Sequence, residues 1–268
     1  MMTEQALPTP AEAAPVTHCA LCLKRRVLVV SHIIPNAYFR AMKRPSNGKL
    51  VAMDTDPNTR ATYSQDSLSE PLLCSDCEGH FGKWETSWIR KLRLTAKLFT
   101  DGVESVAVPS FEYESFRCFL ISIVWRAAVC SRQEFSLVKF PEDGLEKIRV
   151  DLCAGKAPTE TVIGNRVRKL VDPSGQLKLT DLENFMFTPM PLSEGGLQGY
   201  RLFFAGYVVD FITSKVTRRV SNVPGFVRDT LALKIPAVSV FQVRDFMRMG
   251  MYMVEKHVRG QTAFGSGA

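Results

Sequence analysis

The first strong hydrophobic pattern in the chain runs from Val27 to Pro35, where β-branched and aliphatic residues follow one another closely. Such a run predicts a strand that stops at Pro35, because proline cannot donate to a sheet ladder. A short helix is expected over Asn36 to Lys43. From Arg44 to Glu70 the residues are mostly small, polar or turn-forming, which predicts a long loop.

Helical periodicity follows. Aromatic and aliphatic residues recur at near-helical spacing from Phe81 to Leu94, so we expect a helix to begin near Cys77. Residues 111–132 are apolar on most sides, which predicts a helix at the centre of a core. Residues 142–155 form an amphipathic pattern that predicts a shorter helix ended by Gly155.

The second half reads differently, with strand-like runs over residues 161–171, 199–215 and 225–235. A final helix rich in Met and Phe is expected at about Val240 to Val258. The order of the strands does not follow from the sequence. Asp101 to Pro109 is a plausible boundary between two regions.

Composition and charge narrow the picture only slightly. Hydrophobic residues make up 46% and charged residues 23%, as in an ordinary globular protein. The net charge of +7 is compatible with a nucleic-acid partner, but it is equally common in proteins without one. The N-terminus lacks a basic start and an apolar core, and the most apolar run, Phe119 to Cys130, is interrupted by Arg126. We therefore expect a cytoplasmic protein without membrane insertion.

Seven cysteines include two CxxC pairs, Cys19 with Cys22 and Cys74 with Cys77. Four thiolates with this spacing suit a tetrahedral structural zinc ion, the second pair standing at a predicted helix start. Redox motifs or unrelated buried cysteines are the alternatives. The other three cysteines lie in apolar, helical-looking sequence, where cysteine is usually a small buried hydrophobe.

The sequence thus predicts an α+β protein in three parts. Residues 1–17 would form a flexible tail, residues 18–100 a treble-clef zinc module of ββα-like type, and residues 101–268 a mixed helix and strand domain.

Residues 18 to 95 resemble the HNH, or His-Me finger, nuclease family. The matching motifs are the first CxxC, the HIIP segment at His32 to Pro35, and LLCSDC at Leu72 to Cys77. In that family the histidine deprotonates water for attack on a phosphodiester, and a divalent metal stabilises the developing charge. The resemblance implies that His32 is the catalytic base and that Mg²⁺ or Mn²⁺ assists.

The family pattern is incomplete in this chain. Ser31 stands where the family has an acidic metal ligand, and Ser69 stands where it has an asparagine. The family's histidine after the second CxxC is Glu78, which could still bind the catalytic metal through oxygen. Asp66 is a further carboxylate in the preceding loop. A non-catalytic His32, packed at a strand end, is the alternative.

A longer stretch resembles an uncharacterised bacterial family of stand-alone proteins with such a degenerate HNH-like head. The shared segments extend from SHIIP through LLCSDCEGHFGKWE to FLISIVWRAAVCSRQEFSLV, which includes Trp125 and Arg126. This resemblance implies a bacterial or phage setting, such as antiviral defence, but no particular activity.

Basic residues flank the proposed zinc site in sequence and are candidates for contacts with nucleic-acid phosphates. A solvated surface is the alternative for each cluster. The candidates are Lys24, Arg25, Arg26, Arg40, Lys43, Arg44, Arg90, Lys91 and Arg93.

Two functions follow from the sequence. The first is an HNH-like, metal-dependent nuclease acting on DNA or RNA, with His32 as base. The second is a non-catalytic, zinc-stabilised protein that binds nucleic acid or another protein, including a second copy of itself. A third possibility is that residues 101–268 carry the effector function and the zinc module only docks them.

Overall fold

The computed structural model describes residues 16–44, 48, 50–53, 58–100 and 102–259. Its N-terminal region is built on a sheet of order β1-β2-β5, formed by Val16–His18, Arg25–His32 and Ser69–Cys74. Helix α2 (Ser75–Ala96) starts where β5 ends, and the short helix α1 (Asn36–Lys43) follows β2. The predicted strand and both helices are therefore confirmed.

The segment predicted as a loop contains a small antiparallel hairpin, which corrects that expectation. Its strands are β3 (Leu50–Ala52) and β4 (Thr62–Ser64). Both strands are only three residues long, too short for an alternating pattern to stand out from the surrounding polar residues.

The second sheet has the strand order β6-β11-β7-β10-β9-β8. Strands β7 and β11 are parallel, and the other neighbours are antiparallel. The strands are β6 (Ser105–Ala107), β7 (Gly164–Val171), β8 (Phe187–Glu194), β9 (Leu197–Phe204), β10 (Tyr207–Ile212) and β11 (Lys234–Ser239).

The run 199–215 is a hairpin of β9 and β10, turning at Ala205 and Gly206. Both residues have positive φ, 50° and 71°, as the two-residue turn of a tight hairpin requires. Strand β8 was not predicted, because Pro189 and Pro191 disfavour a strand; they are tolerated here since β8 is an edge strand. The predicted strand at 225–235 is wrong, since β11 begins only at Lys234.

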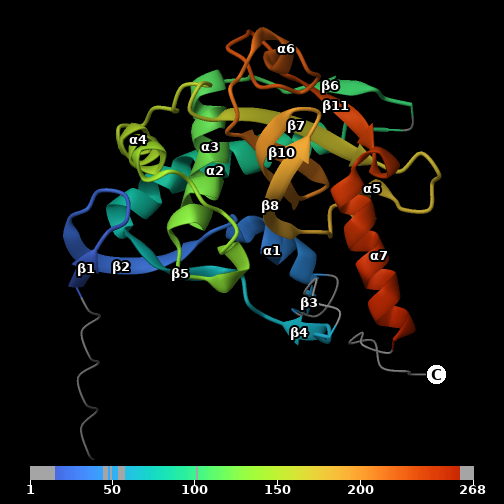
Figure 1. Cartoon of the computed structure of the whole chain (residues 1–268), viewed down its shortest axis with the longest axis horizontal. Helices are drawn as coiled ribbons and strands as arrows, with labels where there is room; N and C mark the ends of the chain where they lie inside the picture. The colour runs from blue at the N-terminus through green and yellow to red at the C-terminus, as the bar shows by residue number, and fades with distance from the viewer. Residues whose placement is uncertain (1–15, 45–47, 49, 54–57, 101, 260–268) are drawn as a thin grey trace, which may run out of the picture.

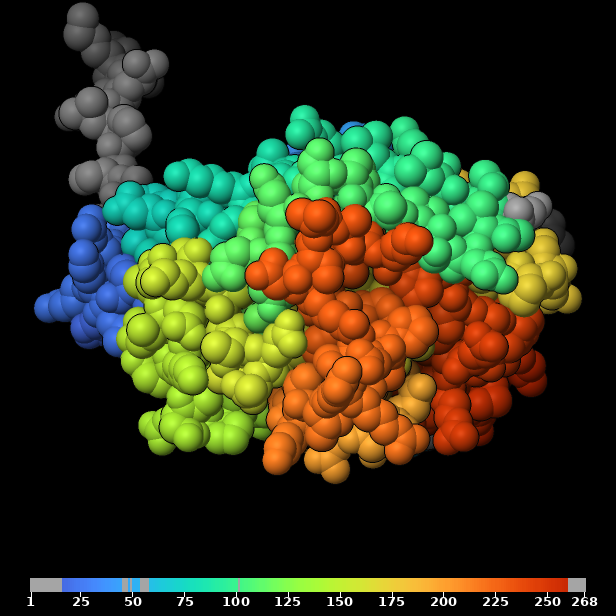
Figure 2. Space-filling model, turned by 90° about the horizontal axis from the view of Figure 1, so that it is seen from above, coloured from blue at the N-terminus to red at the C-terminus, as the bar shows by residue number. Residues whose placement is uncertain are grey.

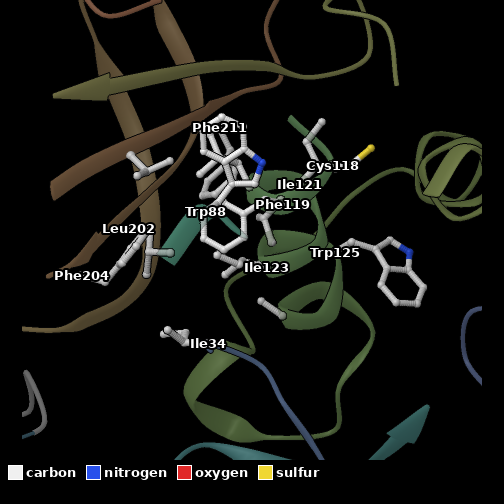
Figure 3. Packing of buried hydrophobic residues seen from close by; sticks show 14 of the residues in the cluster. Ile34, Trp88, Cys118, Phe119, Ile121, Ile123, Trp125, Leu202, Phe204 and Phe211 are labelled. Carbon is white, nitrogen blue, oxygen red and sulfur yellow. The ribbon is translucent and has the colours of Figure 1, made fainter. Parts of the chain in front are cut away.

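Helix α3 (Tyr113–Val129) packs against α2 and lies inside the largest hydrophobic cluster, as its apolar pattern predicted. Figure 3 shows Trp88 of α2 and Phe119 of α3 meeting Leu202, Phe204 and Phe211 of the second sheet. Ile34, from the N-terminal region, belongs to the same cluster. The helices and the sheet thus share one core across residue 100, while the division into domains stays a prediction.

The remaining helices are peripheral. Helix α4 (Glu142–Cys153) ends before Gly155, whose φ of 75° stops it as predicted. Helix α7 (Arg244–Val258) lies along one edge of the molecule (Figure 1). Short helical segments complete the fold: η2 (Gln133–Phe135), α5 (Leu179–Leu182), α6 (Arg218–Ser221) and η3 (Val240–Gln242).

The chain is thus mixed α+β, with elements of its first and second halves in direct contact on the face seen in Figure 2. Among the described residues, no helix combines the length and apolar character needed to cross a bilayer. Of the cysteines outside the CxxC pairs, Cys118 is buried, but Cys153 is exposed, contrary to expectation, because it occupies the outer side of α4.

Candidate functional site

The four CxxC cysteines come together at one end of the N-terminal sheet. Their sulfur atoms all lie within 4.8 Å of one another, and Cys22 Sγ is 3.9 Å from Cys74 Sγ. Cys19, Cys74 and Cys77 are buried, and Cys22 is half-buried. In the described part of the chain, this is the one group of three or more His, Cys, Asp or Glu side chains so placed.

Local backbone structure holds these thiols. Leu23 adopts a positive φ of 60°, which turns the chain sharply between the first cysteine pair and β2. The Cys19 backbone N–H donates to the Lys24 carbonyl at 3.0 Å, and the Cys74 N–H donates to Cys19 Sγ at 3.3 Å. Arg149 of α4 donates to the Leu21 carbonyl at 2.5 Å, so a later helix supports the same turn.

The donor set fits a metal ion. Four sulfur atoms around one ion with Zn–S bonds of about 2.3 Å would be roughly 3.8 Å apart, close to the distance between Cys22 and Cys74. Burial and the neighbouring thiols raise the pKa of Cys77. A bound cation would offset the cost of holding thiolates here. Cys74 is the N-cap residue of α2 and Cys77 lies in its first turn, where the helix dipole also favours negative charge.

His32 is the last residue of β2, at the opposite end of that strand from the cysteine turn. It pairs in the ladder with Ser69, the position at which the resembling family has asparagine. Ser31 is fully buried, and its hydroxyl lies 3.5 Å from the Val29 carbonyl. His32 itself is half-buried and can therefore be reached from solvent.

Glu78, in the first turn of α2, lies beside Ser31. Burial raises the pKa of Glu78, while the Ser31 hydroxyl and Arg126 oppose the shift. Its Oε2 atom is buried and receives no hydrogen bond from any described residue. A buried carboxylate oxygen without a donor is costly unless a cation, a proton or water meets it.

Two further charged residues act on both His32 and Glu78, and sequence reasoning did not assign them to the site. Glu85 lies seven residues after Glu78, so both occupy one face of α2. The fully buried Arg126 of α3 forms an ion pair with Glu85 and donates to the Ser122 carbonyl at 3.2 Å. The signal that could have identified Arg126 is its position as an arginine inside the most apolar stretch of the sequence.

Burial, together with nearby basic residues, favours the neutral imidazole of His32. Burial lowers the pKa of His32 below its ordinary value, and Glu85 opposes this effect. Arg126, Lys43 and Arg40 lower the pKa further. A neutral imidazole near pH 7 can accept a proton, as a general base must.

Asp66, the additional carboxylate of the loop, is engaged elsewhere. Its Oδ2 pairs with Arg132, and its Oδ1 accepts from the Leu68 N–H at 2.8 Å. Arg132 also donates to the Ser69 carbonyl at 3.2 Å. This contact ties the segment after α3 to the strand that faces His32.

The nine basic candidates lie in different places. Lys24, Arg25 and Arg26 are exposed just before and at the start of β2, six to eight residues from His32, so the extended chain separates them from it by about 20 to 26 Å. Arg26 lies 3.9 Å from Asp76, and Arg44 and Arg90 are exposed.

The other candidates either act on His32 or make contacts within the chain. Arg40 and Lys43 of α1 act on His32, and Lys43 also donates to the Gln65 carbonyl at 2.6 Å. Lys91 binds the Ser110 carbonyl at 2.7 Å and Glu112 at 2.9 Å, and Arg93 donates to the Ala37 carbonyl at 2.9 Å. The structure therefore brings Arg40 and Lys43, rather than all nine residues, to His32.

Comparison of the chain with protein-family models, with curated proteins and with solved structures found no match. The case for a function therefore depends on the geometry of the cysteine cluster and on the charged residues around His32 and Glu78.

Proposed function

We propose that the chain is a zinc-stabilised, HNH-like nuclease that hydrolyses phosphodiester bonds in DNA or RNA. The observation that supports this most is that the same two charged residues, Glu85 and Arg126, act on both His32 of β2 and Glu78 of α2. A strand pair followed by a helix that starts at the second CxxC is the arrangement expected of a treble-clef, ββα-like module.

Zinc is the metal that we assign to Cys19, Cys22, Cys74 and Cys77. Four thiolates in a closed tetrahedral set are typical of structural zinc, which has no open position for a substrate. In this role the ion fixes the start of α2, and with it Glu78, against the strand that carries His32.

In the proposed reaction, neutral His32 takes a proton from the attacking water. Arg40 and Lys43 would attract the phosphate group of the substrate, since both lie within electrostatic range of the imidazole. The Arg126–Glu85 ion pair would hold in place one carboxylate that acts on His32.

A catalytic Mg²⁺ or Mn²⁺ would be held by the orphaned oxygen of Glu78 together with water and substrate phosphate. Magnesium sites commonly use only one or two protein carboxylates, so a single ligand from α2 is compatible with this assignment. When bound, the ion would stabilise negative charge on the phosphate and on the leaving oxygen.

The test is cleavage of plasmid and single-stranded substrates with Mg²⁺ or Mn²⁺, with zinc content measured in parallel. We expect the wild-type chain to cleave, and His32→Ala and Glu78→Ala to lose at least about a hundredfold in rate, the scale of general-base catalysis. His257→Ala, which changes an exposed histidine of α7, is the matched control and should cleave normally. Undiminished cleavage by His32→Ala would refute the mechanism.

A non-catalytic, zinc-stabilised binding protein is the second candidate, and one observation favours it. Ser31 replaces the acidic ligand of the resembling family, and among the described residues the cysteine cluster is the one compact metal-ligand group. This candidate predicts no cleavage with either metal. It also predicts a gel shift that weakens as salt rises, because phosphate contacts release counterions, and that persists in His32→Ala.

A further inference from the structure

Helix α7 has apolar side chains on two nearly opposite faces. Its inner face places Phe246, Met249 and Met253 against the hydrophobic cluster formed with β7, β9 and β10. Its outer face carries a second set, the α7 stripe, which is open to solvent. The exposed fractions are 37% for Met247, 62% for Met251, 63% for Val254 and 79% for Val258.

The α7 stripe has the spacing of a helix-pairing seam. Its four residues are separated by four, three and four positions, which is the a/d pattern of a heptad repeat. The stripe borders an open groove of about 570 Å³, lined also by Leu177, Val240 and the half-exposed Phe241. A helix laid along the stripe would cover these residues together and remove their apolar surface from water.

The charges beside the stripe indicate which helix would fit. Arg248 and Glu255 flank the stripe on the same side, seven residues apart. Within the chain, Arg248 pairs with Asp245 at 3.2 Å, and Glu255 pairs with Arg259 in the next turn. All four of these side chains lie at the surface or near it, so both flanking charges remain available to a second partner.

An antiparallel copy of α7 matches this arrangement. With a twofold axis midway between Met251 and Val254, Met251 meets Val254 of the partner subunit, and Met247 meets Val258 of the partner subunit. The same axis brings Arg248 close to Glu255 of the partner subunit, twice, because the interface is isologous. Opposite charges along the edge of a helix pair set its orientation.

We propose that the chain forms a homodimer through antiparallel pairing of α7 with α7 of a second copy. The stripe and its flanking charges complement themselves under one twofold rotation, a property that a site for an unrelated protein has no need to possess. The interface lies on α7, away from the cysteine cluster, so the dimer does not depend on the proposed nuclease activity.

The first test is the mass of the full-length protein by light scattering after size exclusion, at concentrations up to the order of 100 µM, where weak dimers associate. We expect twice the chain mass of 30.0 kDa. Met251→Lys should be monomeric with an unchanged circular dichroism spectrum, since the residue is exposed. Val150→Lys, at an exposed apolar position on α4, should stay dimeric.

The second test uses charge reversal to check the orientation. Arg248→Glu and Glu255→Arg should each weaken self-association by about tenfold, because each creates two like-charge contacts per dimer. Mixing the two variants should restore association as a heterodimer, and the double variant Arg248→Glu/Glu255→Arg should again form a homodimer.

A monomeric wild type would overturn the proposal, whether the stripe is covered by another segment of the chain or by a different protein. A dimeric Met251→Lys would place the interface elsewhere and overturn it as well. Failure of the mixed charge variants to associate would contradict the antiparallel pairing.

Discussion

Two buried polar clusters are held in this molecule by opposite means. The cysteine cluster places four sulfur atoms within 4.8 Å of one another. The second cluster, here the Asp210 cluster, lies on the large sheet. Three arginines surround Asp210 there, and two further carboxylates form ion pairs with one of these arginines. Its members are Asp210, Arg166, Arg168, Arg201, Glu194 and Asp245.

The Asp210 cluster is balanced from within, with three guanidinium groups facing three carboxylates. Strand register does this, because Asp210 stands directly opposite Arg166 of β7 and Arg201 of β9. Arg201 Nε donates to Asp210 Oδ1 at 2.6 Å, and its Nη1 reaches Asp245 of α7 at 3.0 Å. A one-residue slip of register would turn these charges into the opposite, apolar face of the sheet.

In our proposal the cysteine cluster is balanced by a bound metal ion. It combines thiols that would repel one another as thiolates, and a metal ion is the counter-charge that suits them. The charges of the sheet are thus balanced through its own strand register, whereas in our proposal the N-terminal region relies on a bound metal ion. Each of the following predictions tests one side of that contrast.

Loss of the metal should have the largest effect. Cys74→Ser removes a buried ligand at the start of α2, and structural zinc contributes binding energy on the order of 10 kcal/mol to small modules. We expect loss of bound zinc and unfolding of the N-terminal region, measured by metal analysis and by thermal melting. Cys153→Ser, at an exposed cysteine outside the cluster, is the control and should keep its zinc and its melting temperature.

Removing the central carboxylate of the Asp210 cluster should have the second largest effect on stability. Asp210→Asn leaves three buried arginines without their shared carboxylate, which we expect to cost about 3–5 kcal/mol. For a chain of this size that is on the order of 10 °C in Tm. Zinc content should stay at the wild-type level, and Asp229→Asn, at an exposed aspartate, should melt normally. Zinc loss in Asp210→Asn would contradict the independence of the two clusters.

Acid should remove the same contribution gradually. The pKa of Asp210 is lowered: burial would raise it, but Arg201, Arg168 and Arg166 outweigh burial. A carboxyl whose pKa is lower in the folded state stabilises the protein above the unfolded value of about 3.9 and stops doing so as pH falls through the folded value. The difference in unfolding free energy between wild type and Asp210→Asn should therefore shrink below about pH 4. A constant difference in urea titrations at pH 7 and pH 3 would contradict this.

The smallest effect concerns Glu78, on which Arg126 acts but whose Oε2 atom receives no hydrogen bond from any described residue. Glu78→Gln removes a partly buried carboxylate whose Oε2 lacks a donor, so we expect stability to rise by up to about 1 kcal/mol. Cleavage, in contrast, should fall, since residues kept for function are often costly to stability. Glu104→Gln, at an exposed position, should change neither quantity. A destabilised Glu78→Gln would assign the residue a structural role.

The sequence predicted what is encoded locally. The strand before Pro35, the helix at Asn36–Lys43, the helix at the second CxxC and the buried helix α3 all follow from periodicity and from proline or glycine signals. The four cysteines were predicted to meet, and their sulfur atoms do lie together. In each case the signal lies within a few neighbouring residues.

What the sequence did not give depends on contacts between distant segments. Strand β8 was not predicted because its prolines are tolerated only at the edge of a sheet, and the strand order decides which strand lies at the edge. Glu85 and Arg126 were missed as neighbours of His32, because the two charges meet only once α2 and α3 have packed together. The basic residues at the start of β2 are close to His32 in sequence, but the extended strand separates them from it in space.

The central claim is that four cysteines hold one zinc ion that fixes the start of α2 against the strand of His32, and X-ray absorption at the zinc edge tests it most directly. The account predicts one zinc per chain with four sulfur ligands at about 2.3 Å. A metal-free folded protein, or a first shell containing nitrogen or oxygen, would contradict it.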